Sequence, residues 1–91
     1  MWETTDPDGR RVVLSFDSWR HIVDEHGELE SHRRRVLAAV REPDRQMAGR
    51  LPHEEWFYLA TARPTHWIKV AVHFEGDVGR IVTAFPRRRF P

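Results

Sequence analysis

The sequence has no cysteine among its 91 residues and no long apolar run. Disulfide bonds and thiolate metal sites are therefore excluded, so any metal ion would need histidine or carboxylate ligands. The longest apolar runs, residues 36–40 and 68–72, fall far short of the roughly 20 residues that cross a bilayer, and we expect a soluble protein without membrane contacts. Residues 1–11 hold three acids and two arginines, unlike a secretory signal, which makes the cytoplasm the expected location.

A large net charge is also lacking, because 15 basic residues nearly balance 14 acidic ones and leave a formal charge of +1. This balance, together with 40% hydrophobic residues, is typical of one small globular domain and unlike a disordered chain. Residues 1–44 hold seven basic and ten acidic side chains, whereas residues 45–91 hold eight basic and four acidic ones. The second half is therefore favoured for contact with an anion, although a solvated basic surface would have the same composition.

Turn and cap signals divide the chain into consecutive parts. The run Asp6-Pro7-Asp8-Gly9 predicts a β-turn in which Gly9 takes a positive φ. Further signals bound two helices: an N-cap at Asp17 or Ser18, a left-handed stop at Gly27, a second start near Glu28 and a final stop at Pro43. We expect one domain over residues 1–91, made of a hairpin (1–16), two helices (17–43), an antiparallel sheet (44–86) and a basic tail (87–91).

From residue 44 onward the apolar residues alternate with polar ones, a period that is typical of strands. Four strands are predicted, over residues 46–51, 55–62, 66–74 and 80–85. The loops between them are short and polar, which favours antiparallel neighbours because parallel strands need a longer crossover. The expected fold class is α+β, with an N-terminal β-hairpin and two helices packed on one face of a four-stranded antiparallel sheet.

The same alternation assigns side chains to the two faces of this sheet. The face under the helices is expected to receive the apolar set of the third strand, Ile68, Val70, Val72 and Phe74. In the last strand we expect Val82 and Ala84 to point inward, and the intervening residues Ile81, Thr83 and Phe85 to point outward. The open face is predicted to carry aromatic rings, one cation and polar groups, namely Trp56, Tyr58, Trp67, Lys69, His73 and Thr83.

Aromatic rings interleaved with a cation on an open sheet are typical of a platform for single-stranded nucleic acid, where each stacked base contributes roughly 1–3 kcal/mol. A protein partner, a second copy of the chain in a homodimer, or the N-terminal hairpin could cover the same rings instead. The run Arg87-Arg88-Arg89 would add nonspecific phosphate contacts or remain a solvated tail. The residue pattern alone leaves these alternatives open.

Two side chains have the chemistry for proton transfer or charge stabilisation. His26 closes the apolar stripe of the first helix, where it would act as an acid or base near neutral pH or cap the helix. Lys69 is the only lysine and stands in mid-strand among apolar residues, so its amine is expected to reach either an anion or solvent. His21, His26 and His32 do not align on one helical face, and there is no Gly-rich phosphate loop. We therefore expect neither a metal nor a cofactor.

Four blocks of the sequence, taken in order, resemble a nuclease superfamily. The blocks are Trp19–Leu29, the helix end Arg41–Asp44, the strand Trp67–Val72 and the strand Ile81–Phe85. Their order is similar to that of the small phage and toxin–antitoxin nucleases of the barnase, EndoU, colicin and RelE-like superfamily, over residues 16–86. Gly27 stands where those proteins usually carry a proline.

The resemblance implies metal-independent RNA cleavage, in which the 2′-hydroxyl attacks the adjacent phosphate and leaves a cyclic phosphate. By matching positions, His26 would be the acid or base, Lys69 would stabilise the phosphorane and Thr83 would bind phosphate. Substrate-binding candidates placed by the expected geometry are His32, Arg50, Trp56, Tyr58, Trp67, Arg87 and Arg88. RNA is thus the expected partner, with an antitoxin or immunity protein as a further one. The alternative function is a noncatalytic module that binds protein or RNA through the open face.

Overall fold

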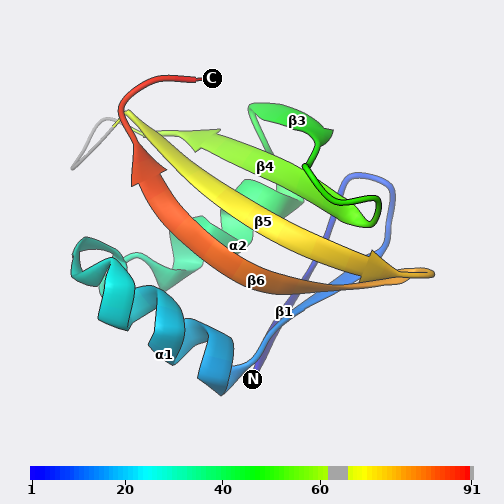
Figure 1. Ribbon diagram of the computed structural model, residues 1–91, viewed down its shortest axis with the longest axis horizontal. Coiled ribbons are helices and arrows are strands. Elements are labelled where there is room, and N and C mark those ends of the chain that lie inside the picture. The colour runs from blue at the N-terminus through cyan, green and yellow to red at the C-terminus, as the bar shows by residue number, and fades with distance from the viewer. Residues whose placement is uncertain (62–65, 91) are drawn as a thin grey trace.

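The computed structural model describes residues 1–61 and 66–90, and Figure 1 shows its two α-helices on the same side of a curved sheet. No helix in the described residues is long and apolar enough to cross a membrane. In chain order the elements are β1 (Trp2–Thr5), β2 (Arg11–Leu14), α1 (Phe16–Glu25), a 3-10 turn (Gly27–Leu29), α2 (Arg33–Arg41), β3 (Arg45–Ala48), β4 (Glu54–Ala60), β5 (Trp67–Glu75) and β6 (Val78–Arg87).

The sheet has six strands in the order β1-β2-β6-β5-β4-β3, and it is mixed rather than antiparallel. The α+β class is confirmed, but the prediction of a four-stranded antiparallel sheet was wrong. The difference arises at β2, which pairs in parallel with the first residues of β6. A parallel pair needs a long crossover, and the helices and strands that lie between β2 and β6 along the chain supply it. The hairpin therefore extends the sheet and does not cover its open face.

Charged groups hold the turn of the β1–β2 hairpin against the rest of the sheet. Gly9 adopts a φ of +84°, as the sequence predicted. The buried Asp6 carboxylate accepts the backbone N–H groups of Asp8 and Arg10 at 3.1 and 2.8 Å, and the Arg10 Nε–H at 2.8 Å. The Arg10 guanidinium in turn donates to both carboxylate oxygens of Glu55 on β4 at 2.9 Å. One buried carboxylate thus organises the turn and links it to a distant strand.

The helix boundaries differ from the prediction. Ser15, rather than Asp17 or Ser18, caps α1, because its Oγ accepts the backbone N–H of Ser18 at 3.1 Å. Gly27 does not take a positive φ and instead opens the 3-10 turn. Since this turn uses the residues predicted to begin the second helix, α2 starts only at Arg33.

One hydrophobic core lies between the helices and the sheet, and it confirms the alternation predicted for β5. Helix α1 packs on β6, and α2 packs on β1, β4 and β5. The opposite face of the central strands therefore stays free of helices. The buried core residues are Val12, Leu14, Ile22, Leu29, Val36, Ala39, Val40, Phe57, Ile68, Val70, Val72, Phe74, Ile81 and Ala84.

A β-bulge shifts the register of β6, which the periodicity of the sequence did not reveal. Ile81 pairs with Val72 and Thr83 pairs with Ala71, so Val82 is an extra residue between two pairs. Ile81 is buried in the core whereas Val82 is half-buried outside it, the reverse of the prediction. One inserted residue moves the alternation by one position, and beyond it the predicted orientations hold.

The other strands lie where they were predicted, with boundaries that differ by one to three residues. The largest difference is at β3, which ends at Ala48 because Gly49 already belongs to the turn and donates its N–H to the Glu54 carbonyl at 2.7 Å. A tight turn with Gly76 at φ +62° lets β6 begin at Val78. The loop predicted at Arg63 and Pro64 lies outside the described residues.

Replacing Asp6 by alanine should lower the free energy of unfolding by about 2–3 kcal/mol, because two turn N–H groups and Arg10 lose a buried charged acceptor. Urea unfolding followed by tryptophan fluorescence measures the change. The matched control is Asp8→Ala, since the Asp8 side chain is 74% exposed and 3.8 Å from Arg10. This control should change stability by less than about 0.5 kcal/mol. Equal losses in the two variants would contradict the role given to Asp6.

Candidate functional site

A depression crosses the face of the sheet opposite the helices, and we refer to it as the Lys69 depression. It is formed by β4, β5, β6 and the loop before β4. Four residues that the sequence predicted for the site, Arg50, Trp56, Lys69 and Thr83, come together in it. The complete lining is Arg50, Leu51, Glu54, Trp56, Lys69, Ala71, Thr83 and Phe85.

The Lys69 side chain is enclosed by aromatic rings and is only 7% exposed as a residue. Its Nζ lies 3.4 Å from the ring centroid of Trp56 and at 5.4 and 5.7 Å from those of Phe85 and Tyr58. These distances are within the range of cation–π attraction, which is strongest for tryptophan. The rings therefore hold the amine in place and shield most of the side chain from water.

Other charges around the amine are mostly positive. Burial lowers the pKa of Lys69 below its ordinary 10.5, and the charges of Arg87 and Arg50 lower it further, against the opposing effect of the Glu54 carboxylate. No carboxylate of residues 1–61 or 66–90 forms an ion pair with Lys69. The arrangement suits an anionic ligand, because such a ligand would supply the contact charge that the protein does not.

Glu54 is the acidic group of the depression, and three neighbours hold it. Oε1 accepts the Arg50 backbone N–H at 2.9 Å and the Trp56 indole N–H at 3.0 Å, while Oε2 lies 2.9 Å from Nε2 of His73. Burial raises the pKa of this carboxyl, but the hydrogen bonds from His73, the Arg50 backbone and Trp56 outweigh it, so the pKa is lowered overall. Glu54 is therefore an ionised, fixed carboxylate.

His26, the predicted acid or base, approaches the depression from one side. It is the C-cap of α1, where its backbone N–H donates to the Ile22 carbonyl at 2.7 Å. The ring lies against Phe85 on β6, 5.6 Å from the Phe85 ring with an interplanar angle of 30°. Phe85 is thus a shared neighbour of His26 and Lys69, but His26 itself does not line the Lys69 depression.

The chain itself covers the other end of the aromatic face. The Phe90 ring lies 4.9 Å from the ring of Tyr58 and 5.4 Å from that of Trp67, and these two rings meet edge to face at 6.3 Å. Tyr58 is consequently fully buried, which raises the pKa of its hydroxyl, and that hydroxyl has no hydrogen-bond partner among the described residues. The platform expected from the sequence is therefore partly occupied by the C-terminal segment.

The predicted basic tail begins later than expected, because β6 continues through Arg87. Arg87 pairs in register with Trp67 on β5, and its charge acts on both Lys69 and Tyr58. Arg88 follows the strand and is exposed. Of these two predicted phosphate contacts, Arg87 is near the Lys69 amine, and neither residue lines the depression.

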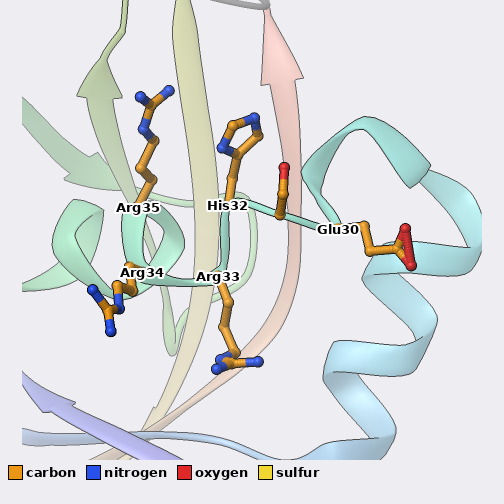
Figure 2. Close-up of a pocket in the computed structure, with 6 residues that line it drawn as sticks. Glu30, His32, Arg33, Arg34 and Arg35 are labelled. Atoms are coloured by element: carbon orange, nitrogen blue, oxygen red, sulfur yellow. The ribbon is translucent and has the colours of Figure 1, made fainter.

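His32 lies in a different place from the other predicted substrate-binding residues. Figure 2 shows that the side chains around it diverge, since His32 and Arg35 point one way whereas Arg33 points the other way. The Arg33 guanidinium lies over the Trp2 ring, 4.2 Å from its centroid. The structure therefore does not bring His32 together with Lys69. The depression that His32 lines, before and at the start of α2, is formed by Glu30, Ser31, His32, Arg33, Arg34 and Arg35.

Four residues around the site were missed or only partly used in the prediction from sequence. Glu54 was left out because the predicted strand began one residue after it, although the alternation from Trp56 would place it on the open face. His73 was assigned to that face but not to the site, since no local pattern pairs it with Glu54. Phe85 was expected to point outward and had no role, and Phe90 carried no signal at all.

No family model, curated protein or solved structure matches the chain. The function proposed for the chain therefore rests on the geometry of the depression and on the resemblance of its sequence to small nucleases. Within residues 1–61 and 66–90, no group of three histidine, aspartate or glutamate side chains is placed to hold a metal ion.

The sole lysine allows its ionisation to be followed alone, by NMR of protein labelled with ¹³C-lysine. We expect the Lys69 Cε resonance to titrate with a midpoint below 10.5. Arg50→Gln should raise this midpoint because a like charge is removed, whereas Glu54→Gln should lower it further because an opposite charge is removed. Arg41→Gln, an exposed change at the end of α2, is the control and should leave it unchanged. Shifts of the opposite sign would contradict the electrostatic description of the site.

Proposed function

We propose that this protein is a metal-independent ribonuclease that binds single-stranded RNA across the Lys69 depression. The observation that carries the proposal is the Lys69 amine, which is buried against Trp56, lacks a contact anion among the described residues and shares the depression with Thr83. A buried cation without a contact anion is costly, and a phosphate would supply the missing charge. The type of reaction comes from the resemblance of the sequence to small nucleases.

Aromatic rings beside the cations support a nucleic acid as the ligand. Trp56 and Phe85 line the depression on either side of Lys69 in the strand order, with Arg50 at its rim. Base stacking on such rings contributes roughly 1–3 kcal/mol per base, and the cations bind the connecting phosphates. A purely apolar protein partner would use the rings but would leave the buried amine without an anion.

In the proposed reaction the 2′-oxygen bonds to the adjacent phosphorus while the bond from phosphorus to the 5′-oxygen breaks. The products are a 2′,3′-cyclic phosphate and a 5′-hydroxyl end. Negative charge on the phosphate oxygens rises in the transition state, and the protonated Lys69 amine stabilises it there, with Thr83 as a hydrogen-bond donor. The resemblance assigns proton transfer to His26. An antitoxin or immunity protein would inhibit the reaction by covering the same face.

A noncatalytic RNA-binding module is the second candidate, and one observation favours it. His26 packs on Phe85 and does not line the Lys69 depression, so the residue implied as acid or base is not at the centre of the site. Such a module would use Lys69 and Arg50 to bind phosphates without cleaving the chain. Activity measurements on point variants distinguish the two functions.

The purified protein should cleave unstructured RNA in the presence of EDTA and leave 2′,3′-cyclic phosphate ends. Lys69→Met keeps the length of the stem and its packing on Trp56 but removes the charge, so it should lower the single-turnover rate by about 10²–10³-fold. Quantitative analysis of fragment ends measures both effects.

His26→Ala tests the role implied by the resemblance, and His21→Ala is its matched control. Both histidines belong to the α1 region, but His21 is exposed and lies 2.6 Å from Glu25, so its loss should leave cleavage unchanged. RNA that binds but stays intact with the wild-type protein would contradict the nuclease proposal and favour the binding module. Complete loss of cleavage in EDTA would contradict the metal-independent reaction.

RNA affinity should depend on salt through the cations of the depression. Arg50→Ala should weaken binding of a fluorescent 2′-O-methyl oligonucleotide and reduce the slope of log affinity against log salt by about 0.7 for each phosphate that Arg50 neutralises. Fluorescence anisotropy over a range of salt concentrations measures this slope. Arg41→Ala, an exposed arginine at the end of α2, should leave the slope unchanged. An unchanged slope for Arg50→Ala would place the RNA on another surface.

A further inference from the structure

The open face holds a carboxylate–imidazole pair to which neither the sequence pattern nor the resemblance gave a role. We propose that His73, oriented by Glu54, takes the proton from the attacking 2′-hydroxyl. This inference rests on the ribonuclease function proposed above and moves the proton-accepting step from His26 to His73. In this assignment His73 is a catalytic residue and Glu54 is a positioning residue.

The pair is built across two neighbouring strands. Glu54 on β4 and His73 on β5 are direct partners in the antiparallel register, and Oε2 lies 2.9 Å from Nε2. Side chains of such partners point to the same face, so the contact does not depend on a flexible loop. The pair is thus fixed by the same hydrogen-bonded ladder that positions Lys69.

Several contacts immobilise the Glu54 carboxylate. Its other oxygen accepts the Arg50 backbone N–H and the Trp56 indole N–H. Gly49 gives the side chain the space that it occupies, because a Cβ on that glycine would collide with Glu54. A carboxylate held in this way cannot turn to accept a proton from substrate, but it can orient a neighbouring imidazole.

Orientation by the carboxylate determines which nitrogen of His73 is available. An ionised carboxylate only accepts hydrogen bonds, so the neutral imidazole donates its Nε2–H to Glu54 and keeps a lone pair on Nδ1. The His73 side chain is 30% exposed whereas that of Glu54 is 13% exposed. The imidazole can therefore meet solvent or substrate while its partner stays shielded, which is the arrangement needed for a general base.

His73 also lies between the Lys69 depression and the basic side chain of Arg80. Glu54 lines the Lys69 depression, while His73 lines an adjoining one together with Arg80, its partner in register on β6. A single strand of RNA across this face would place one phosphate at Lys69 and Thr83 and a neighbouring one at Arg80. The ribose between these phosphates would then pass His73.

The proton and the bonds balance in this assignment. As the bond from the 2′-oxygen to phosphorus forms, Nδ1 of His73 takes the 2′ proton, and the bond from phosphorus to the 5′-oxygen breaks. The leaving 5′-oxygen takes a proton from solvent water, and the imidazolium afterwards returns its proton to solvent. Three charged groups surround His73: Glu54 from β4, Arg80 from β6 and Glu75 on β5 itself.

The test is steady-state kinetics on an RNA oligonucleotide in EDTA, with product ends identified. His73→Gln keeps a donor for Glu54 but lacks a basic nitrogen, so it should lower kcat by about 10²–10⁴-fold with little change in KM. His73→Ala should recover part of its rate when free imidazole is added, an effect that a structural role would not produce. His53→Ala is the matched control, because this nearby side chain is exposed and its backbone carbonyl still accepts the Phe74 N–H.

The positioning role of Glu54 has its own readout. Glu54→Gln removes a negative charge next to the imidazole, which favours the neutral ring and should move the acidic limb of the kcat profile to lower pH. Glu54→Gln should also lower kcat. In the His53→Ala control, the acidic limb of the kcat profile should stay at the pH of the wild-type limb. An unmoved limb in Glu54→Gln would overturn the assignment of the base to His73.

The possible outcomes separate this inference from the proposed function. Cleavage by the wild type, with a normal kcat in His73→Gln and a large loss in His26→Ala, would overturn the role of His73 and leave the ribonuclease intact. RNA that the wild type never cleaves would overturn the ribonuclease and the role of His73 together. A large loss in His73→Gln with imidazole recovery in His73→Ala supports both.

Discussion

The pairing of β5 between β4 and β6 is the interaction that positions both the core and the candidate site. Its period of two sends Ile68, Val70 and Val72 into the core beneath the helices and sends Lys69 and His73 to the opposite face. Because both neighbours are antiparallel and hydrogen-bonded to β5, each outward side chain acquires fixed neighbours on either side. The core and the candidate site are therefore two faces of the same ladder.

The energetic cost of burying Lys69 is the feature of this face that favours an anionic ligand. Removing an ammonium group from water costs several kcal/mol, whereas a well-placed aromatic ring returns about 0.5–2 kcal/mol. The nearby charges of Arg50 and Arg87 add to the cost, and the Glu54 carboxylate opposes them. In the free protein, packing of the strands must therefore offset the part of this cost that the rings do not. A bound anion would reduce that remaining cost. The imbalance is a physical reason for a phosphate-binding role, independent of any likeness to nucleases.

The C-terminal segment limits where a ligand can reach. Phe90 packs on Tyr58 and Trp67, which leaves Tyr58 fully buried and Trp67 half-buried, while Trp56 and Phe85 remain in the wall of the depression. Figure 1 shows this end of the chain turning back beyond β6, on the side away from the helices. The side chains that a ligand can contact are consequently concentrated around Lys69 and the Glu54–His73 pair, in the central part of the face.

Local sequence patterns were enough to predict the α+β class, the two faces of β4 and β5, and the gathering of Trp56, Lys69 and Thr83 on one of them. Those properties follow from periods and turn residues that act over a few positions of the chain. Long-range packing alone set the parallel pairing of β2 with β6, the bulge at Val82, the contact of Glu54 with His73 and the covering of Tyr58 by Phe90. Each of these depends on residues that are distant in sequence, and their contacts are selected by the packing of the whole sheet, which no local pattern encodes.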